Sequence, residues 1–481
     1  MNSNPFQPKV AVAGGGLAGL AAACALSDSG FRVTLFERRP YLGGRASSYE
    51  HPGTNEVVDN CQHVLFRVCT NLLDFYRRIA ADDKIRWFDE MTFIEPGGRS
   101  STMHSSSLPA PLHTAPSFLR FPFLTRKDKF AISRAIATLT FIAQPDIGES
   151  FLDWCRRHGQ TVNAIQRFWK PILVSALSED LELISVSYAA QVVRESMKSR
   201  EARLMGVPTI PLTELYNRAG NYIRKRGGDI RFRTSLRCFI PESSGVRVGT
   251  GTEESFDYLV LALPFENLEP VLPQSPEAAP LRDKISHFES APITGIHLWF
   301  DRQITNLDHA VLLDRTIQWM FHKSRLLATR ASASENESGS YIELVVSASK
   351  SLIEKSKSEI VDLALGEVRE FFPRARTANL LKSIVIKEVR ATYSPRPGID
   401  RFRPQHATVW PRVFLAGDWT ATGWPATMEG AVRSGYLAAQ SLGQASGIKM
   451  PLLLVPDLSP SGFMHCRQLF QQKQFKLVSP I

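Results

Sequence analysis

A glycine-rich turn between a strand and a helix, close to the N-terminus, limits the folds open to this chain more than any other feature. Residues 9–13 are typical of a buried parallel strand, residues 20–27 are Ala-rich and favour a helix, and between them stands Gly14-Gly15-Gly16-Leu17-Ala18-Gly19. Gly14 permits the tight turn, Gly16 lets the backbone approach a pyrophosphate, and Gly19 lets helix and strand pack closely. The first helical amides, those of Leu17 and Ala18, then face the phosphates. The pattern predicts an α/β fold with a Rossmann-type dinucleotide-binding domain.

Acidic and basic residues after the second predicted strand extend this motif. The strand over residues 32–36 leads to Glu37, about 20 residues beyond the turn, where a carboxylate would hold the ribose hydroxyls. A second glycine turn follows, and we expect Arg38, Gly44 and Arg45 to add phosphate contacts. Two alternatives to cofactor binding remain: the glycine turn could be only structural, and the Arg38-Arg39 pair could be only solvated surface.

A second cofactor segment is predicted near the other end of the chain, and it favours FAD over NAD. Residues 413–418 are typical of a buried strand that ends in a carboxylate, and we expect Asp418 to hold a ribityl hydroxyl. A helix rich in small residues begins near residue 426, and its N-terminus would stabilise negative charge on the flavin. We expect the ring system to contact Gly417, Met428, Glu429 and Ala431. No cysteine lies in residues 400–440 and His406 precedes the strand, so FAD should be noncovalent.

The order of predicted elements indicates a discontinuous cofactor domain with a second domain inserted into it. We assign residues 1–75, 206–280 and 401–445 to FAD binding, and residues 76–205 and 281–400 to a mixed α+β substrate domain. The role of residues 446–481 stays open. Residues 328–340 are typical of an exposed loop. Aromatic residues are frequent in the insert, where they could line an apolar tunnel or simply form core: Phe118, Phe121, Phe123, Phe130, Phe141, Phe151, Trp154, Phe168 and Trp169.

Composition excludes some functions and leaves others open. The formal net charge of +10 would attract nucleic acid, anionic lipid or an acidic substrate, and charge alone does not choose among them. The dinucleotide motif leads us to expect no nucleic-acid partner. The six cysteines and eleven histidines lack metal-ligand spacing, so we expect no metal site.

The chain shows neither a secretory signal nor an apolar run of about 18 residues. We therefore expect a cytoplasmic protein whose membrane contact, at the inner face, is at most peripheral. The apolar stretch from residue 108 to residue 124 is flanked by Arg120, Arg126, Lys127 and Lys129. It could dip into a bilayer surface, or it could be an ordinary loop packed on the core.

Together, the two ends resemble the flavin-dependent desaturase and amine oxidase superfamily, over about residues 9–439. Several inner segments resemble its squalene-associated branch, the hydroxysqualene dehydroxylases. These segments are Val58-Asp59-Asn60-Cys61-Gln62-His63-Val64-Leu65, Phe168-Trp169-Lys170-Pro171, Pro292-Ile293-Thr294-Gly295 with His297-Leu298-Trp299-Phe300, and Gly417-Asp418-Trp419-Thr420 running to Gly435. Cys61 departs from the small Gly expected at its position.

The resemblance implies that an allylic alcohol of the squalene skeleton loses water and accepts hydride from N5 of reduced flavin. An electron donor, which the sequence does not identify, would reload the flavin. Asp59 and His63 are the candidates for the acid that protonates the departing hydroxyl, or for polar positioning. Alternatively, Asp59 caps the helix that begins near Thr70 or bonds backbone amides, and His63 is a satisfied interior histidine.

Three other functions remain open at this point. A carotenoid desaturase would transfer hydride in the opposite direction, from an apolar polyene to oxidised flavin. An amine oxidase would need an aromatic cage, for which Trp419 and Trp424 form no convincing pair. A lipid carrier that holds flavin without turnover would have little reason to keep Glu37, Arg45 and Asp418 together.

Overall fold

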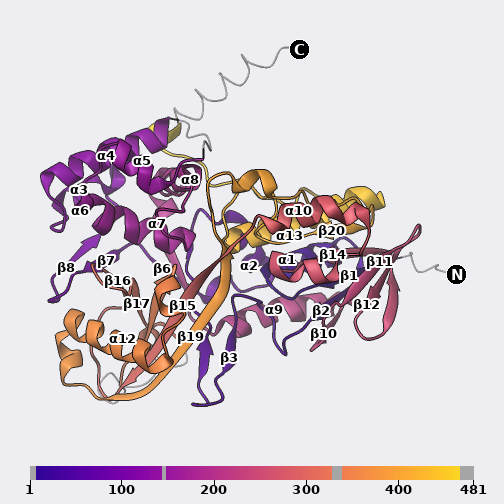
Figure 1. Ribbon diagram of the computed structural model, residues 1–481, viewed down its shortest axis with the longest axis horizontal. Coiled ribbons are helices and arrows are strands. Elements are labelled where there is room, and N and C mark those ends of the chain that lie inside the picture. Colours follow the sequence, from indigo (N-terminus) through magenta and orange to yellow (C-terminus); the bar gives the residue numbers. More distant parts are fainter. Residues whose placement is uncertain (1–6, 143–147, 328–338, 466–481) are drawn as a thin grey trace, which may run out of the picture.

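Two large sheets organise the computed structural model, which describes residues 7–142, 148–327 and 339–465 (Figure 1). The first sheet is parallel, in the order β10-β2-β1-β14-β20. Its inner strands are buried along most of their length because both faces are covered. In chain order they are β1 (Lys9–Ala13), β2 (Arg32–Glu37), β10 (Asp229–Phe232), β14 (Tyr258–Leu261) and β20 (Val413–Leu415). This sheet confirms the predicted Rossmann-type α/β fold.

Different layers cover the two faces of the parallel sheet. Val10 and Val12 point into a cluster with four helices: α1 (Leu17–Asp28), α2 (Thr70–Arg78), α9 (Leu212–Lys225) and α13 (Met428–Ser446). Ala11 and Ala13 point the other way, toward the antiparallel meander of β11 (Cys238–Pro241), β12 (Val246–Gly249) and β13 (Glu253–Phe256). The small residues of α1 and α13 allow close packing: a Cβ on Gly435 would lie 2.2 Å from Ala18 O.

The second sheet is largely antiparallel, in the order β19-β15-β18-β17-β16-β7-β8. Helix α12 covers one face, where Ile342, Leu344 and Val346 of β18 are buried. The opposite face carries Tyr341, Glu343 and Val345. The elements are β7 (Met91–Ile94), β8 (Ser100–Met103), β15 (Ser290–Phe300), β16 (His309–Leu312), β17 (Trp319–His322), β18 (Tyr341–Ser347), β19 (Leu380–Tyr393) and α12 (Lys357–Phe371).

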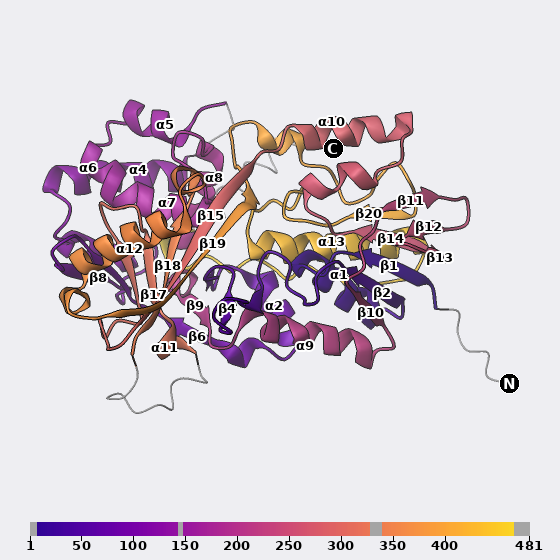
Figure 2. The ribbon, with the colours of Figure 1, turned by 60° about the horizontal axis from the view of Figure 1, so that its bottom comes forward.

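A group of helices lies beside the second sheet, at the end of the molecule away from the parallel sheet (Figures 1 and 2). These are α3 (Ala115–Arg120), α4 (Arg126–Phe141), α5 (Phe151–Arg157), α6 (Val162–Ala164), a π-helical turn over Ile165–Trp169, α7 (Lys170–Leu177) and α8 (Val186–Met197). The remaining elements are β3 (Ser48–Glu50), β4 (Val57–Asp59), β5 (Leu65–Phe66), β6 (Ile85–Phe88), β9 (Met205–Pro208), α10 (Ala279–Ser286) and α11 (Lys323–Leu326). Within the described ranges, no helix is long and apolar enough to cross a membrane.

The aromatic residues of this helical region mostly form core rather than a tunnel. Phe121, Phe151, Trp154 and Trp169 are at most 1% exposed, and their rings pack against neighbouring rings in edge and stacked contacts. Phe118, Phe123 and Phe168 are buried as well. Phe130 and Phe141 differ, because they lie on the surface of α4 and line no interior space.

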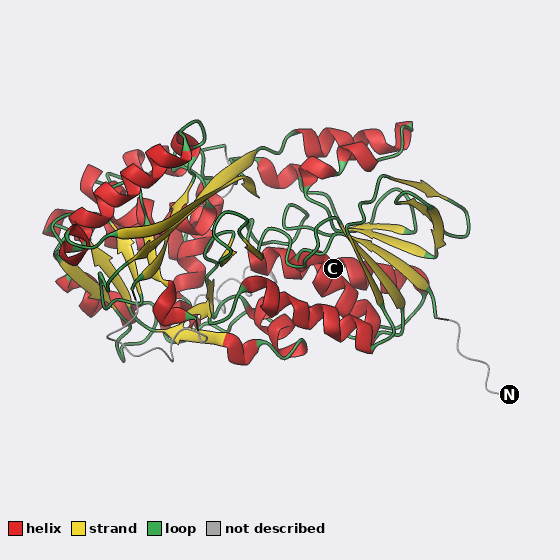
Figure 3. Ribbon diagram, turned by 90° about the horizontal axis from the view of Figure 1, so that it is seen from below, coloured by secondary structure: helices red, strands yellow, loops and turns green. Residues whose placement is uncertain are grey.

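The predicted domain ranges stay a prediction, although the strands of each large sheet lie within the ranges assigned to it. One small sheet, β5-β9-β6, joins strands from both units. Figure 3 shows one group of strands in each half of the molecule, with helices beside each group. Part of the C-terminal extension packs on the core, since Leu453 is buried and Val455 N–H donates to Asn71 Oδ1. Residues 328–338 of the predicted loop and residues 466–481 lie outside the described residues.

Candidate functional site

The three glycines of the first turn occupy their positions for different structural reasons. Gly14 has a φ of +114°, and a Cβ there would lie 2.3 Å from Ala262 O. A Cβ on Gly19 would lie 1.9 Å from Gly14 O, so this glycine lets helix and strand touch. Around Gly16 the nearest atom to a Cβ would be Gly44 Cα, at 3.8 Å. The packing of the protein therefore requires Gly14 and Gly19, whereas Gly16 leaves open space, as a site for the pyrophosphate of FAD needs.

The start of α1 supplies unpaired donors next to that space. The helix begins at Leu17, and its N-cap residue, Gly16, has no side chain to cap it. The amides of Leu17, Ala18 and Gly19 therefore have no partner within the helix, and they lie at the positive end of its dipole. This arrangement fits a phosphate group.

The second glycine turn lies directly against the first. Gly43 N–H donates to Gly15 O at 2.9 Å, and a Cβ on Gly44 would lie 2.8 Å from Gly16 Cα. Arg39 braces this turn, because its Nη1 donates to Gly44 O at 2.8 Å. Arg38, the residue predicted to bind phosphate, is exposed. In the structure Arg39, and not Arg38, contacts this turn, and the phosphate contact expected of Arg38 stays a prediction.

Glu37 stands at the end of β2 beside the turn, as predicted. It is buried, and its Oε2 accepts from Gly15 N–H at 2.7 Å while Oε1 accepts from Arg39 N–H at 2.8 Å. These bonds fix the direction of the carboxylate. Each oxygen keeps a further lone pair, so the group can still accept from ribose hydroxyls.

The two ends of the chain meet at this site. Arg45 Nη1 lies 3.2 Å from Asp418 Oδ2, although the two residues are 373 positions apart, and Arg45 Nη2 lies 3.5 Å from Glu266 Oε2. Gly417 N–H donates to Ser434 Oγ of α13 at 2.8 Å, which ties the end of β20 to the helix that follows. The predicted proximity of the N-terminal and C-terminal motifs is confirmed.

The start of α13 also presents free amides. Thr427 Oγ1 accepts from Gly430 N–H at 3.1 Å, and Ala431 N–H bonds Thr427 O, which leaves Met428 and Glu429 N–H without helical partners. The Glu429 side chain serves another purpose: its carboxylate accepts from the backbone amides of Asn71, at 3.2 Å, and Leu72, at 2.8 Å, and so caps α2. The expected cofactor role of Glu429 is therefore left to its backbone. The sequence offered no signal for this cap, which joins residues more than 350 positions apart.

Beside the cofactor site lies a buried ion cluster of Asp59, Lys323 and Glu343. Lys323 Nζ contacts Asp59 Oδ2 at 2.7 Å, Glu343 Oε2 at 3.3 Å and Gln62 Oε1 at 2.8 Å. Asp59 Oδ1 also accepts from Ser48 Oγ and Leu212 N–H. The three ionisable side chains are at most 5% exposed. The cluster joins the end of β4, where the predicted catalytic segment begins, to α11 and to strand β18 of the second sheet.

The protonation states in this cluster bear on the expected roles. Burial alone would raise the pKa of Asp59, but the Lys323 ammonium and the hydrogen bonds outweigh burial and hold the pKa below its ordinary value. Asp59 is therefore ionised at neutral pH and has no proton to give. Burial raises the pKa of Glu343 to about 7, and Lys323 offsets this only in part. The contact of Lys323 with Glu343, at 3.3 Å, is longer than its contact with Asp59, at 2.7 Å.

His63 follows the cluster on the segment that resembles the squalene branch. Its Nδ1 lies 2.7 Å from Cys61 O, and since a carbonyl only accepts, Nδ1 carries the proton and Nε2 is left as an acceptor. Burial lowers the pKa of His63, so the ring is neutral at pH 7. A neutral ring with an unprotonated Nε2 can accept a proton, and the catalytic role of His63 stays a prediction. The segment packs on β15, where a Cβ on Gly295 would lie 3.1 Å from Asn60 O.

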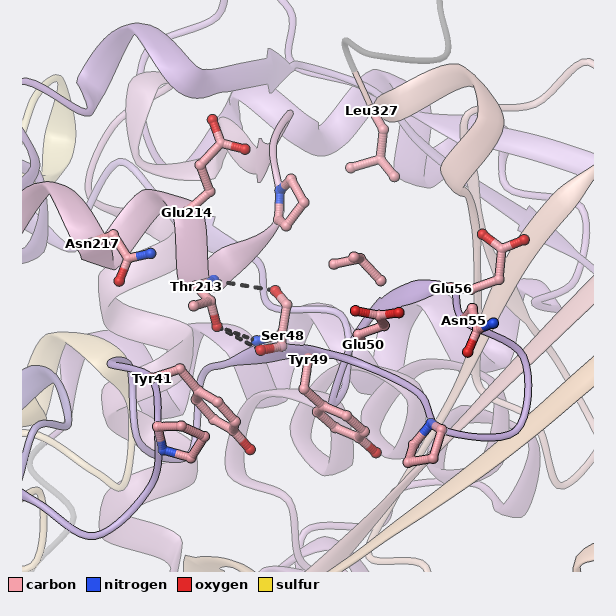
Figure 4. A pocket seen from close by; sticks show the side chains of 14 residues that line it. Tyr41, Ser48, Tyr49, Glu50, Asn55, Glu56, Thr213, Glu214, Asn217 and Leu327 are labelled. Atoms are coloured by element: carbon pink, nitrogen blue, oxygen red, sulfur yellow. Dashed lines mark hydrogen bonds between the residues drawn. The ribbon is translucent and has the colours of Figure 1, made fainter. Parts of the chain in front are cut away.

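A cleft of about 910 Å³ opens on the outer side of β3 and α9 (Figure 4). The stacked rings of Tyr41 and Tyr49 form one wall, and Glu214 lies on another. Ser48 and Thr213 bond each other in its floor, which separates solvent from Asp59. No residue predicted from sequence as part of the site lines this cleft, and no His, Cys, Asp and Glu grouping suited to a metal is found in the described ranges.

Comparison with known proteins agrees with the cofactor geometry. The family model "Flavin containing amine oxidoreductase" matches residues 17–442. The chain is 27% identical over 462 residues to a 15-cis-phytoene desaturase of Synechococcus elongatus, covering 90% of this chain and 95% of the relative. It is 28% identical over 479 residues to a probable zeta-carotene desaturase of the same organism, covering 92% and 99%.

Solved structures share the fold at low identity. An oxidoreductase from Methanosarcina mazei superposes with a TM-score of 0.69 at 16% identity, covering 91% of this chain and all of the other. A putrescine oxidase gives a TM-score of 0.69 at 16% identity, covering 92% and 99%. The match of the family model over most of the chain, on a site that fits FAD, shows that this protein belongs to the flavin-containing amine oxidoreductase family and is an FAD-dependent oxidoreductase.

Proposed function

We propose that the protein transfers hydride between FAD and an apolar isoprenoid, and that its reaction is the reductive dehydroxylation of hydroxysqualene to squalene. The observation that carries this proposal is the segment from Asp59 to Leu65, on which the resemblance to hydroxysqualene dehydroxylases rests. It lies between the two large sheets, with its first residue bound to Lys323 and its middle packed on β15. A segment in that position can contact both the cofactor and a substrate.

The reaction needs one hydride and one proton, because the allylic C–O bond breaks, a C–H bond forms and the hydroxyl leaves as water. Reduced FAD supplies the hydride when it is bound. Of the buried groups near the segment, Asp59 is ionised and His63 is neutral, so neither supplies the proton. Glu343, whose burial raises its pKa to about 7, still holds a dissociable proton near neutral pH. Within this proposal we assign Glu343, which lies in the same cluster as Asp59, as the proton source.

Carotenoid desaturation is the second candidate, and two observations favour it. The relatives described above are named as phytoene and zeta-carotene desaturases. Desaturation also releases a proton together with the hydride, and the open Nε2 of neutral His63 could accept it. Amine oxidation has less support, because Trp419 is fully buried, with Nε1 donating to Leu263 O at 3.0 Å, and Trp424 is buried as well.

The two candidates require opposite starting states of the flavin, and this separates them. Enzyme reduced anaerobically in deuterated water exchanges the N5 hydrogen with solvent. In a single turnover with hydroxysqualene, we expect squalene that carries one deuterium, together with return of the oxidised flavin spectrum. Reduced enzyme that leaves hydroxysqualene unchanged, while oxidised enzyme bleaches on addition of phytoene, would overturn dehydroxylation in favour of desaturation.

A further inference from the structure

Exposed apolar side chains concentrate at the helical end of the molecule. Of the fourteen large hydrophobic residues that are exposed among the described residues, seven lie between residues 108 and 162. They are Leu108, Leu112, Leu119, Phe130, Phe141, Ile142 and Val162. An eighth, Phe463, is adjacent, because its N–H donates to Ala110 O at 2.9 Å. Single exposed apolar residues are ordinary, but a concentration in one region indicates a surface that contacts an apolar phase or partner.

Helix α4 shows that this exposure follows a helical stripe. Arg126, Phe130, Arg134, Ala137 and Phe141 recur every three or four positions, so they share one side of the helix, and all five are exposed. The opposite side, with residues such as Ile132 and Leu139, is fully buried. Phe130 is 72% exposed, which is far more than a ring packed beneath a loop would be.

A neighbouring segment continues the stripe into a face. Leu119 at the end of α3 is 64% exposed and touches α4, because Lys129 Nζ donates to Leu119 O at 2.7 Å. We call Leu119, with the exposed stripe of α4 that contains Phe130, the α3–α4 face.

The charges around this face have one sign. Residues 108–142 contain five cationic side chains and a single acidic one, Asp128. Asp128 is 3% exposed and is occupied by Thr125, Thr161 and Asn163, so it contributes little negative charge to the surface. The cations are Arg120, Arg126, Lys127, Lys129 and Arg134. Apolar side chains ringed by cations suit the interface of an anionic bilayer, where the rings enter the acyl region and the cations meet phosphate headgroups.

From this geometry we infer that the α3–α4 face docks the protein on an anionic lipid membrane. Leu119 and Phe130 enter the interface, while Arg120, Arg126 and Lys127 contact the headgroups. The inference does not depend on which isoprenoid the enzyme converts, so its test is independent of the test of the proposed function.

The test uses the full-length holoenzyme and two kinds of vesicle, pure phosphatidylcholine and phosphatidylcholine mixed with phosphatidylglycerol. We expect cosedimentation with the anionic vesicles at low salt, weaker binding at about 0.5 M salt, where charges are screened within a few ångströms, and little binding to neutral vesicles. The double variant Leu119→Ser/Phe130→Ser should lower the partition coefficient about tenfold or more, because two exposed apolar side chains no longer enter the interface.

Matched controls separate this face from general effects on the surface. Leu381→Ser/Val389→Ser removes two exposed apolar side chains from β19 and should bind as wild type does. Arg126→Gln/Lys127→Gln should reduce binding and its salt dependence, whereas Lys355→Gln/Lys357→Gln, an exposed pair near the start of α12, should do neither. FAD content and the thermal midpoint check that each variant is folded.

Three outcomes would overturn the inference. The first is wild-type protein that stays in the supernatant with both kinds of vesicle. The second is equal loss of binding in the β19 control and in the Leu119→Ser/Phe130→Ser variant. The third is a wild-type dimer in solution that ignores vesicles and becomes monomeric in that variant, which would assign the face to a second copy of the chain.

Discussion

The cofactor turns and the buried ion cluster lie close together but are built in opposite ways. The turns use backbone amides and glycines from residues 14–45, completed by residues near 418 and 428. The cluster uses charged side chains that are far apart in sequence, since Asp59 and Lys323 are separated by 264 positions. Before a ligand binds, the free backbone amides at a helix start can donate to water. Buried charges have no water to bind, so they must be paired with one another as soon as the protein folds. Substitutions in the cofactor turns should therefore weaken FAD binding and leave the fold intact. Substitutions in the ion cluster should lower the stability of the fold.

The largest expected effect comes from Lys323→Met, which leaves the ionised Asp59 buried without its partner. We expect the free energy of unfolding to fall by about 3 to 5 kcal/mol, measured by urea denaturation of the apo-protein. The double variant Lys323→Met/Asp59→Asn should recover much of this loss because it removes both charges.

Lys382→Met provides the matched control for that measurement. Lys382 pairs with Glu56 at the surface and is 45% exposed, so its loss should cost less than about 1 kcal/mol. Equal effects at Lys323 and Lys382 would refute the idea that the buried cluster is a distinct structural element.

Glu37→Ala tests the cofactor side of the comparison. Loss of charge-assisted hydrogen bonds to the ribose should weaken FAD binding by about 1 to 3 kcal/mol, measured by flavin titration of apo-protein. Glu37→Gln keeps an oxygen that accepts from Gly15 N–H and should lose less. Unchanged affinity in Glu37→Ala would move the ribose contact to another residue.

A further expected effect is a pH dependence that comes from Glu343. Burial raises its pKa from 4.5 in the unfolded chain to about 7 in the folded protein, so the folded state binds more protons between these values. Stability from this group is complete below about pH 4.5 and is lost as the pH rises through about 7, with a slope of at most about 1.4 kcal/mol per pH unit.

Urea denaturation at several pH values, compared between wild type and Glu343→Gln, isolates that contribution from the buried histidines. Because their pKa values are lowered, these histidines act in the opposite direction over a similar range. A difference between the two proteins that does not change from pH 4.5 to 7.5 would show that Glu343 is ionised throughout, and would remove it as the proton source of the proposed reaction.

The sequence predicted the cofactor region well because its signals are local. Gly14, Gly19 and Glu37 lie in one strand-turn-helix-strand unit, so spacing alone identified them, and the C-terminal strand and helix were recognised in the same way. Arg39 was passed over for Arg38 because adjacent arginines look alike until the direction of each side chain is known.

The ion cluster could not be predicted, because no local sequence pattern indicates that Lys323 contacts Asp59. A weak signal did exist in Tyr341-Ile342-Glu343-Leu344-Val345, where a carboxylate stands inside an apolar strand. The protonation states of Asp59 and His63 depend on burial and neighbours, which only the fold supplies.

The contact between Arg45 and Asp418 also bears on how the protein is made. A ribosome releases the glycine turns early, but Asp418 and α13 leave it almost 400 residues later. Until then the side of α1 against which Gly435 later packs is not covered by α13, and uncovered apolar surface of this kind favours aggregation of incomplete chains. FAD therefore binds only after synthesis of the C-terminal part of its site. The free energy of FAD binding then stabilises completed chains and not incomplete ones.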